Sequence, residues 1–109
     1  MRKLVAVLIA LAPALALAAD WKGVPMVDSM CQGKMKDDPD KHPVSCALKC
    51  QDAGYQIKTA DGWVKLDNAG NKLAVAELKS TSKKDHVRVN VSGEKKGDVI
   101  AVSALKLAD

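Results

Sequence analysis

Alternation of apolar and polar residues is clearest in the segment HVRVNV, residues 86–91, where three valines take every second position. This period of two is typical of a strand with one buried face. After a predicted turn at 93–98, residues 99–107 (VIAVSALKL) carry apolar side chains at both parities, which indicates a strand buried on both faces. The C-terminal part of the chain therefore predicts an antiparallel strand pair.

Two shorter alternating segments, residues 55–60 and 63–67, flank the pair Asp61-Gly62. An Asp-Gly pair between such segments is a strong hairpin signal, because both residues tolerate the positive φ that a two-residue turn requires. We therefore predict that Asp61-Gly62 closes a hairpin. A first strand is expected upstream at residues 21–31, where Pro25 indicates an edge or a bulge.

Two segments have helical features. Residues 44–54 (VSCALKCQDAG) follow a proline and end in a glycine, the usual order of helix punctuation, and they come after a polar loop at 32–43. Residues 71–79 contain good helix formers. The apolar side of this second helix is expected to consist of Leu73, Ala76 and Leu78.

The predicted elements follow one another as strand, loop and helix, hairpin, helix and final strand pair. Five short strands with a helix before the last two predict a mainly β fold, a small five-stranded OB-like Greek-key barrel with one or two short helices. The chain length allows one such domain.

The amino terminus has a different pattern, with two basic residues ahead of an uncharged run of mostly Leu, Ala, Val and Ile at 4–17. This order is typical of a secretory signal peptide, and Ala16 and Ala18 supply the small residues that cleavage after Ala18 requires. The alternative is an uncleaved anchor, but the run is shorter than the ~20 apolar residues that span a bilayer.

We therefore expect residues 1–18 to be a signal peptide and residues 19–109 to be a single periplasmic or secreted domain, with no membrane span after cleavage. Removal of Arg2 and Lys3 lowers the formal net charge from +4 to +2. The remaining bases and acids are interspersed, which indicates a solvated surface and argues against a nucleic-acid partner.

The chain is poor in aromatic residues, with two Trp, one Tyr and no Phe, so aliphatic side chains and methionine must form the core. Small exported domains with a light core often add a disulfide or a metal. The candidates here follow the pattern C-x10-H-x3-C-x3-C and are Cys31, His42, Cys46 and Cys50.

These four residues could converge on a metal ion. Cys46 and Cys50 are four residues apart and would share one face of the predicted helix, His42 lies one turn upstream, and Cys31 ends the first predicted strand. Three thiolates and an imidazole suit tetrahedral zinc, and thiolate-rich sites also suit copper(I). The methionines near Cys31, whose thioethers favour copper(I) but which also serve as ordinary core filler, are Met26, Met30 and Met35.

Two other interpretations of the cysteines are a structural disulfide with one spare thiol and a thiol-redox protein. Helical residues four apart have Cβ atoms ~5–6 Å apart, whereas a disulfide needs ~3.5–4.5 Å, so Cys31 is the better partner for Cys46 or Cys50. The Ser, acidic and Gly residues form no known catalytic motif. We therefore expect a non-enzymatic binding domain for a metal ion or small ligand, while any protein partner remains unidentified.

The chain resembles a group of small exported bacterial proteins with an OB-like domain. The resemblance rests on VDSMC at 27–31, the following histidine, CALKCQDAGY at 46–55 and DGWVKLDNAGN at 61–71, which match the form D-S-x-C, His, C-A-x-x-C and Gly. It covers most of residues 23–107. The group has no established biochemical activity, so the resemblance implies the fold and export and leaves the function open. A more distant similarity is to the bacterial exported OB-fold family, which lacks the cysteine cluster.

Overall fold

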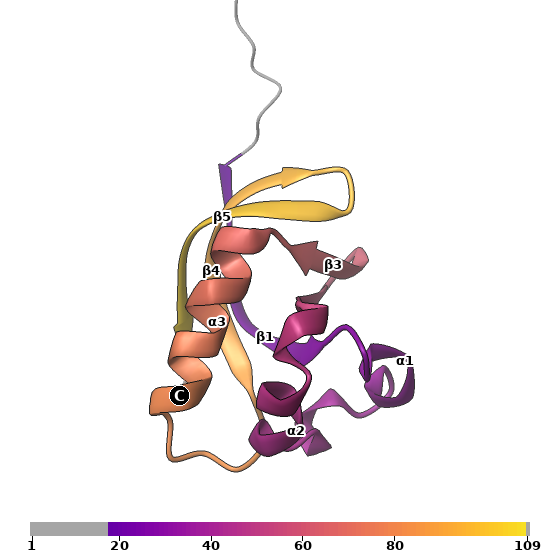
Figure 1. Ribbon diagram of the computed structural model, residues 1–109. Coiled ribbons are helices and arrows are strands. Elements are labelled where there is room, and N and C mark those ends of the chain that lie inside the picture. Colours follow the sequence, from indigo (N-terminus) through magenta and orange to yellow (C-terminus); the bar gives the residue numbers. More distant parts are fainter. Residues whose placement is uncertain (1–17, 109) are drawn as a thin grey trace, which may run out of the picture.

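Five strands close into a barrel in the computed structural model, which describes residues 18–108 (Figure 1). Around the barrel they follow the order β1-β2-β3-β5-β4. This arrangement confirms the predicted fold, a mainly β, small OB-like barrel. The strands are β1 (Ala18–Asp28), β2 (Tyr55–Thr59), β3 (Gly62–Leu66), β4 (Arg88–Lys96) and β5 (Val99–Leu107).

Short helices connect the strands. Between β1 and β2 the chain forms α1 (Gln32–Met35), the 3-10 turn η2 (Pro39–Lys41), α2 (Val44–Lys49) and a second 3-10 turn, η3 (Gln51–Ala53), and between β3 and β4 it forms α3 (Asn68–Ser80). Within residues 18–108 no helix is both long and apolar enough to cross a membrane. The expected signal peptide lies outside the described residues except for Ala18, which begins β1.

The barrel closes because β1 bends from one partner strand to another. Its first part pairs with β4, its last three residues pair with β2, and the register shifts between Trp21 and Val24, where Gly23 has a φ of +62°. On the other side, β3 runs parallel to β5 and pairs Lys65 with Val99 next to the turn of the last hairpin. The remaining pairs are antiparallel.

The core fills the barrel and the space under α3. Alternation in β4 buries Val89 and Val91, as predicted from the sequence, and α3 packs its buried face against β5. Close approach of α3 requires Gly70, since a Cβ there would lie 2.5 Å from a methyl group of Val102. The buried face of α3 consists of Gly70, Ala74 and Leu78, so the prediction is confirmed at Leu78 and is wrong at Leu73 and Ala76, which are exposed.

The predicted hairpin between residues 55 and 67 is present, but its turn is displaced by one residue. Thr59 pairs with Gly62, which leaves Ala60 and Asp61 as the two-residue loop. Among these residues only Gly62 has a positive φ, +116°. The Thr59 hydroxyl donates to the Gly62 carbonyl at 2.8 Å and accepts from the Asp61 amide at 3.2 Å, and these side-chain bonds favour the observed turn.

The last strand pair is longer than predicted and is buried on one face. Residues 93–96, predicted as a turn, continue β4, and the chain reverses at 97–98. The register of β4 and β5 shifts at Gly93, which pairs with Val102 while Ser92 pairs with Ala104. This bulge exchanges the inward parity of β5, so apolar residues at both parities do not require two buried faces.

The segment before β2 also departs from the prediction. Strand β1 ends at Asp28, so Cys31 lies in the following turn rather than at the strand end, and the predicted loop at 32–43 contains α1 and η2. The predicted helix at 44–54 is divided into α2 and η3 at Cys50.

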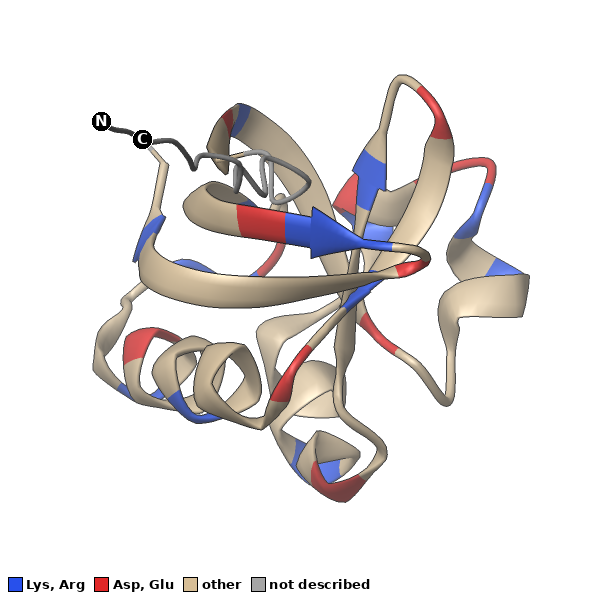
Figure 2. Cartoon of the chain, turned by 90° about the horizontal axis from the view of Figure 1, so that it is seen from above, with Lys and Arg blue, Asp and Glu red and all other residues tan. Residues whose placement is uncertain are grey.

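Charged residues of both signs are spread over the strands, helices and turns (Figure 2). This mixture agrees with the solvated surface expected from the sequence.

Candidate functional site

Three ligand atoms meet where the end of β1 faces α1 and α2 (Figure 1). A carboxylate oxygen of Asp28 and the Sγ atoms of Cys31 and Cys50 all lie within 4.8 Å of one another. Asp28 is the last residue of β1, Cys31 precedes the first residue of α1, and Cys50 follows the last residue of α2. The site therefore depends on three element ends held together by the barrel.

A turn brings Asp28 and Cys31 together. The amide of Cys31 donates to the backbone carbonyl of Asp28 at 3.2 Å and to its side-chain Oδ2 at 3.0 Å. Asp and Asn commonly bind nearby backbone amides in this way, so the carboxylate both shapes the turn and faces the thiol.

The other carboxylate oxygen of Asp28 is bound by His42. Nε2 of His42 lies 2.6 Å from Oδ1 of Asp28, and the two residues are 4% and 0% exposed. His42 is itself fixed by its amide, which donates to the carbonyl of Pro39 at 3.1 Å. A buried carboxylate is thus supported from two sides by hydrogen bonds, which buried polar groups require.

The surroundings of Cys31 favour its neutral thiol. Desolvation, followed by the negative charge of Asp28 and that of Cys50, raises the pKa of Cys31 above its ordinary value. The same neighbourhood affects Tyr55, whose hydroxyl donates to the carbonyl of Ala47 at 2.7 Å. Burial first, and then the charges of Asp28 and Cys50, raise the pKa of Tyr55 to about 12. Burial and negative charge thus outweigh the nearby Lys34, which acts in the opposite direction on Cys31.

The structure brings together two of the four residues predicted as metal ligands. Cys31 and Cys50 belong to the three-atom group, His42 reaches it through Asp28, and Cys46 is exposed and lies outside the group. Cys46 nevertheless sits one helical turn before Cys50, whose amide donates to the Cys46 carbonyl at 3.1 Å. All three cysteines are present as free thiols.

Sequence reasoning missed Asp28 as a member of the site. The available signal was its position three residues before Cys31, in the segment that carries the resemblance to exported bacterial proteins. A spacing of three places two side chains together in a turn or a helix. The expected strand at 21–31 would instead have pointed the side chains of Asp28 and Cys31 to opposite faces.

The three methionines near the site have different environments. Met26 is 1% exposed and belongs to the core, in agreement with its interpretation as core filler. Met30 is 70% exposed, and Met35 is half-buried at the end of α1. The structure thus separates one structural methionine from two that are accessible near Cys31.

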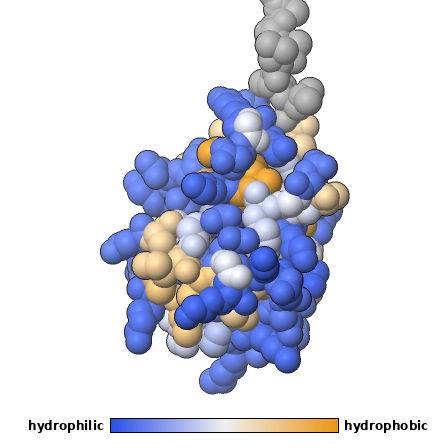
Figure 3. Space-filling model, turned by 90° about the vertical axis from the view of Figure 1, so that its right-hand side faces the viewer, coloured by the Kyte–Doolittle hydropathy of each residue, from blue (hydrophilic) through white to orange (hydrophobic). Residues whose placement is uncertain are grey.

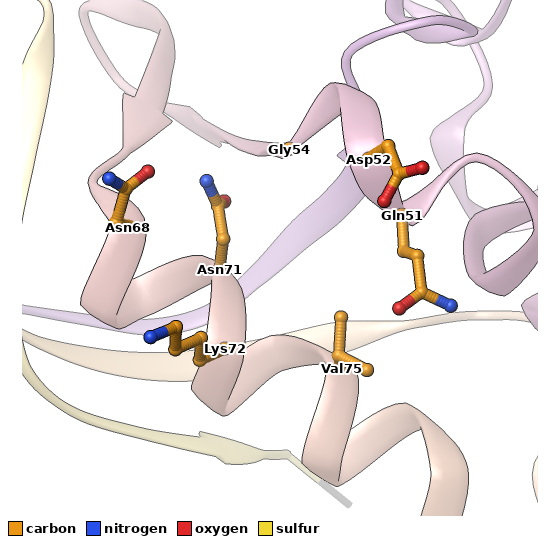
Figure 4. Close-up of a pocket in the computed structure, with 7 residues that line it drawn as sticks. All are labelled: Gln51, Asp52, Gly54, Asn68, Asn71, Lys72 and Val75. Atoms are coloured by element: carbon orange, nitrogen blue, oxygen red, sulfur yellow. The ribbon is translucent and has the colours of Figure 1, made fainter.

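A groove separate from the three-atom group lies between η3 and α3 (Figure 4). Its Asn71 side chain points toward the η3 side of the groove, where its Oδ1 accepts a hydrogen bond from the amide of Tyr55 at 2.9 Å. The side-chain amide of Asn71 therefore has a structural role. The groove is lined by polar and aliphatic residues without Cys or His, namely Gln51, Asp52, Gly54, Asn68, Asn71, Lys72 and Val75.

Comparison of the chain with known protein families finds no match, and comparisons with curated proteins and with solved structures find none either. The interpretation of the site therefore rests on its geometry.

Proposed function

We propose that the protein is a small exported, non-enzymatic domain that binds one zinc or copper ion between Cys31, Cys50 and Asp28. The observation that carries this proposal is the meeting of two thiols and a buried carboxylate within 4.8 Å. In a tetrahedral site with Zn–S bonds of about 2.3 Å, the two sulfurs stand about 3.8 Å apart, so small side-chain movements suffice. Bound metal would also favour the thiolate form of its cysteine ligands, against the raised pKa of Cys31 in the metal-free site.

His42 supports the metal site indirectly in this proposal. The sequence suggested His42 as a direct ligand, but its Nε2 is 2.6 Å from the Asp28 carboxylate. Carboxylates that bind metals are themselves commonly oriented by such hydrogen bonds. His42 would thus fix the direction of the remaining lone pairs of Asp28 toward the two sulfurs.

Cys46 is the candidate for a fourth ligand. It is exposed, and it lies one turn before Cys50 on the same side of the chain, at a separation of ~5–6 Å between Cβ atoms in a regular helix. Rotation of its side chain would complete a site of three thiolates and one carboxylate. A water molecule is the alternative fourth ligand, and the two cases are separable by substitution of Cys46.

Metal titration of the reduced full chain tests the proposal. Cobalt(II) is a suitable probe because thiolate coordination gives intense absorption bands, and zinc can then be measured by its displacement of cobalt. We expect one ion per chain, lost in Cys31→Ser and in Cys50→Ser. Asp28→Asn replaces a carboxylate ligand by a neutral amide and should weaken binding by at least the about 10–100-fold that loss of an outer-shell partner costs at other metal sites. Absence of binding to the reduced wild type would overturn the proposal.

Cys46→Ser serves as the matched control in the same titration. If Cys46 is a ligand, the variant binds cobalt more weakly and its thiolate bands lose intensity. If water completes the site, the variant matches the wild type. Either result leaves Cys31 and Cys50 as the required pair, so it refines the proposal without replacing it.

The same proximity of Cys31 and Cys50 also favours a second candidate, a structural disulfide that joins the turn after β1 to the end of α2. In protein isolated without reductant, this alternative predicts one reactive thiol, Cys46, and two oxidised cysteines. Loss of such a bond should destabilise the domain by ~2–5 kcal/mol. A thiol-redox protein receives less support, because the reactive species is the thiolate and the raised pKa of Cys31 works against it.

Export is part of the proposal and has its own test. It is supported by the basic and apolar pattern of residues 1–17 and by the small residues Ala16 and Ala18. Mass spectrometry of the exported form should show a chain that begins at Ala19 or Asp20. An intact Met1 on protein extracted from membranes would contradict it.

A further inference from the structure

An exposed thioether stands next to the proposed metal site. Met30 is 70% exposed, and within residues 18–108 the other large hydrophobic residue with an exposed side chain is Leu73, at 38%. This exposure leaves the thioether of Met30 accessible from the solvent. Met30 directly precedes Cys31 in the turn after β1.

A second thioether is one turn away on the other side of Cys31. The amide of Met35 donates to the carbonyl of Cys31 at 3.0 Å, an i to i+4 bond, so the two side chains extend from the same side of this turn. Met35 is half-buried, whereas Met26 is enclosed in the core. Figure 3 views the molecule from the side of α1 and shows a hydrophobic patch within a largely hydrophilic surface. Met30 and Met35 therefore flank Cys31 along the chain, one residue before it and four residues after it.

We infer that the metal ion is copper(I) and that Met30 and Met35 receive it before it passes to Cys31 and Cys50. The inference rests on the proposed metal site and adds the identity of the ion and its route. Thioethers and thiolates are soft ligands that prefer copper(I), while zinc gains little from a thioether. Two accessible methionines beside a dithiol would therefore select copper(I) from the competing divalent ions.

The transfer is a ligand exchange without oxidation or reduction. Copper(I) leaves a soluble donor complex, binds the thioether sulfurs and then the two cysteine sulfurs. The two thiols release their protons to the solvent as the copper–sulfur bonds form. The metal stays in the +1 state throughout, so no oxidant or reductant takes part.

Copper(I) transfer under anaerobic conditions tests the inference. The reduced, metal-free full chain is mixed with the copper(I) complex of bicinchoninate, whose visible absorbance falls as the protein removes the metal. The double variant Met30→Leu/Met35→Leu keeps side-chain volume and removes both sulfurs. We expect it to take up copper about tenfold more slowly, the smaller effect typical of groups outside the final ligand set, and to bind cobalt(II) as the wild type does.

Met26→Leu is the matched control, because it makes the same chemical change at a residue that is 1% exposed. It should take up copper at the wild-type rate, and the folded state of all variants is checked by circular dichroism. Equal transfer rates in the wild type and in the double variant would overturn the inference. So would retention of copper by the Cys31→Ser/Cys50→Ser variant, since the cysteines would then not be its destination.

Failure of this inference is distinguishable from failure of the proposed function. If the wild type binds cobalt or zinc through Cys31 and Cys50 but takes up copper independently of its methionines, the metal site stands and the copper route is wrong. If the reduced wild type binds none of these ions, both are wrong.

Discussion

Replacement of His42 by alanine tests whether the bond between His42 and Asp28 holds this side of the domain together. The imidazole is 4% exposed, and its Nε2 is 2.6 Å from an oxygen of a carboxyl group that is 0% exposed. His42→Ala removes this partner and leaves space in the interior. The buried oxygen then has neither its protein partner nor full access to water.

The expected loss follows from these two effects. A hydrogen bond to a charged group contributes about 1.5–3 kcal/mol. Truncation to alanine of a buried side chain as large as that of His42 costs about 2–5 kcal/mol. The nearby thiols of Cys31 and Cys50 are only half-buried, so water can enter and the lower ends of both ranges apply, which gives about 3.5 kcal/mol. Typical domains have about 0.05–0.15 kcal/mol per residue, so this is a large part of the stability.

Urea unfolding of the reduced, metal-free protein, followed by far-ultraviolet circular dichroism, measures this loss. With an m-value of about 2 kcal/mol/M, the midpoint should fall by about 2 M. Asp28→Asn retains the shape and should lose less, about 1–3 kcal/mol. The control is His86→Asn, because His86 is exposed and has a φ of +54°, which Asn tolerates better than Ala. A midpoint in His42→Ala equal to that of the control would refute the reasoning.

Three other predictions concern the barrel and its surface. Gly93→Ala should destabilise the domain by about 2–3 kcal/mol in urea unfolding, because its Cβ would lie 2.3 Å from a carbonyl oxygen of β5. The control is Gly33→Ala, whose Cβ would meet no atom within 4 Å and which should leave the stability nearly unchanged. Tyr55 is the only tyrosine in the sequence, so absorbance at about 295 nm should show its ionisation near pH 12 rather than at the ordinary tyrosine pKa of about 10. Stability that depends on the neutral phenol should be lost as pH rises from the ordinary pKa through the raised one, and titration near 10 in the folded protein would contradict the burial of Tyr55. Arg88→Leu should lower the free energy of unfolding by less than about 1 kcal/mol, since the ion pair with Asp40 is partly exposed. Because Arg88 lowers the pKa of Asp40, the difference in stability between variant and wild type should be present above pH 3.8 and disappear as pH falls through the lowered pKa, and a difference that is unchanged at acidic pH would argue against this pair.

The sequence predicted the barrel because most of its strands follow a simple period. Residues 86–91 and the segments around residue 61 alternate clearly, and their turn residues mark the strand ends. The prediction failed where local geometry changed that period. The bulge at Gly93 exchanged the parity of β5, and the small residue Gly70, rather than a large apolar one, defined the buried face of α3.

The candidate site was only partly predictable for a related reason. Cys31 and Cys50 were expected to meet because residues that suit metals or disulfides are few in this chain. The role of Asp28 depends on a turn that no periodic pattern announces, and the helix α1 after it has four residues, too few to show an apolar period. The burial of His42 beside Asp28 likewise depends on how η2 folds back onto the end of β1.

The barrel is closed by the short parallel pairing of β3 with β5, and Asp67 joins this seam to α3. Its amide donates to the carbonyl of Ile100 at 3.0 Å, while its Oδ1 accepts from the amide of Gly70 at 2.9 Å and from that of Val102 at 3.3 Å. The seam consists of two paired positions, Lys65 with Val99 and Leu66 with Ile100, so few backbone hydrogen bonds hold it closed. An opening that starts at the seam also removes the cap of α3, so the first turn of the helix and the seam should exchange their amide hydrogens as one cooperative unit.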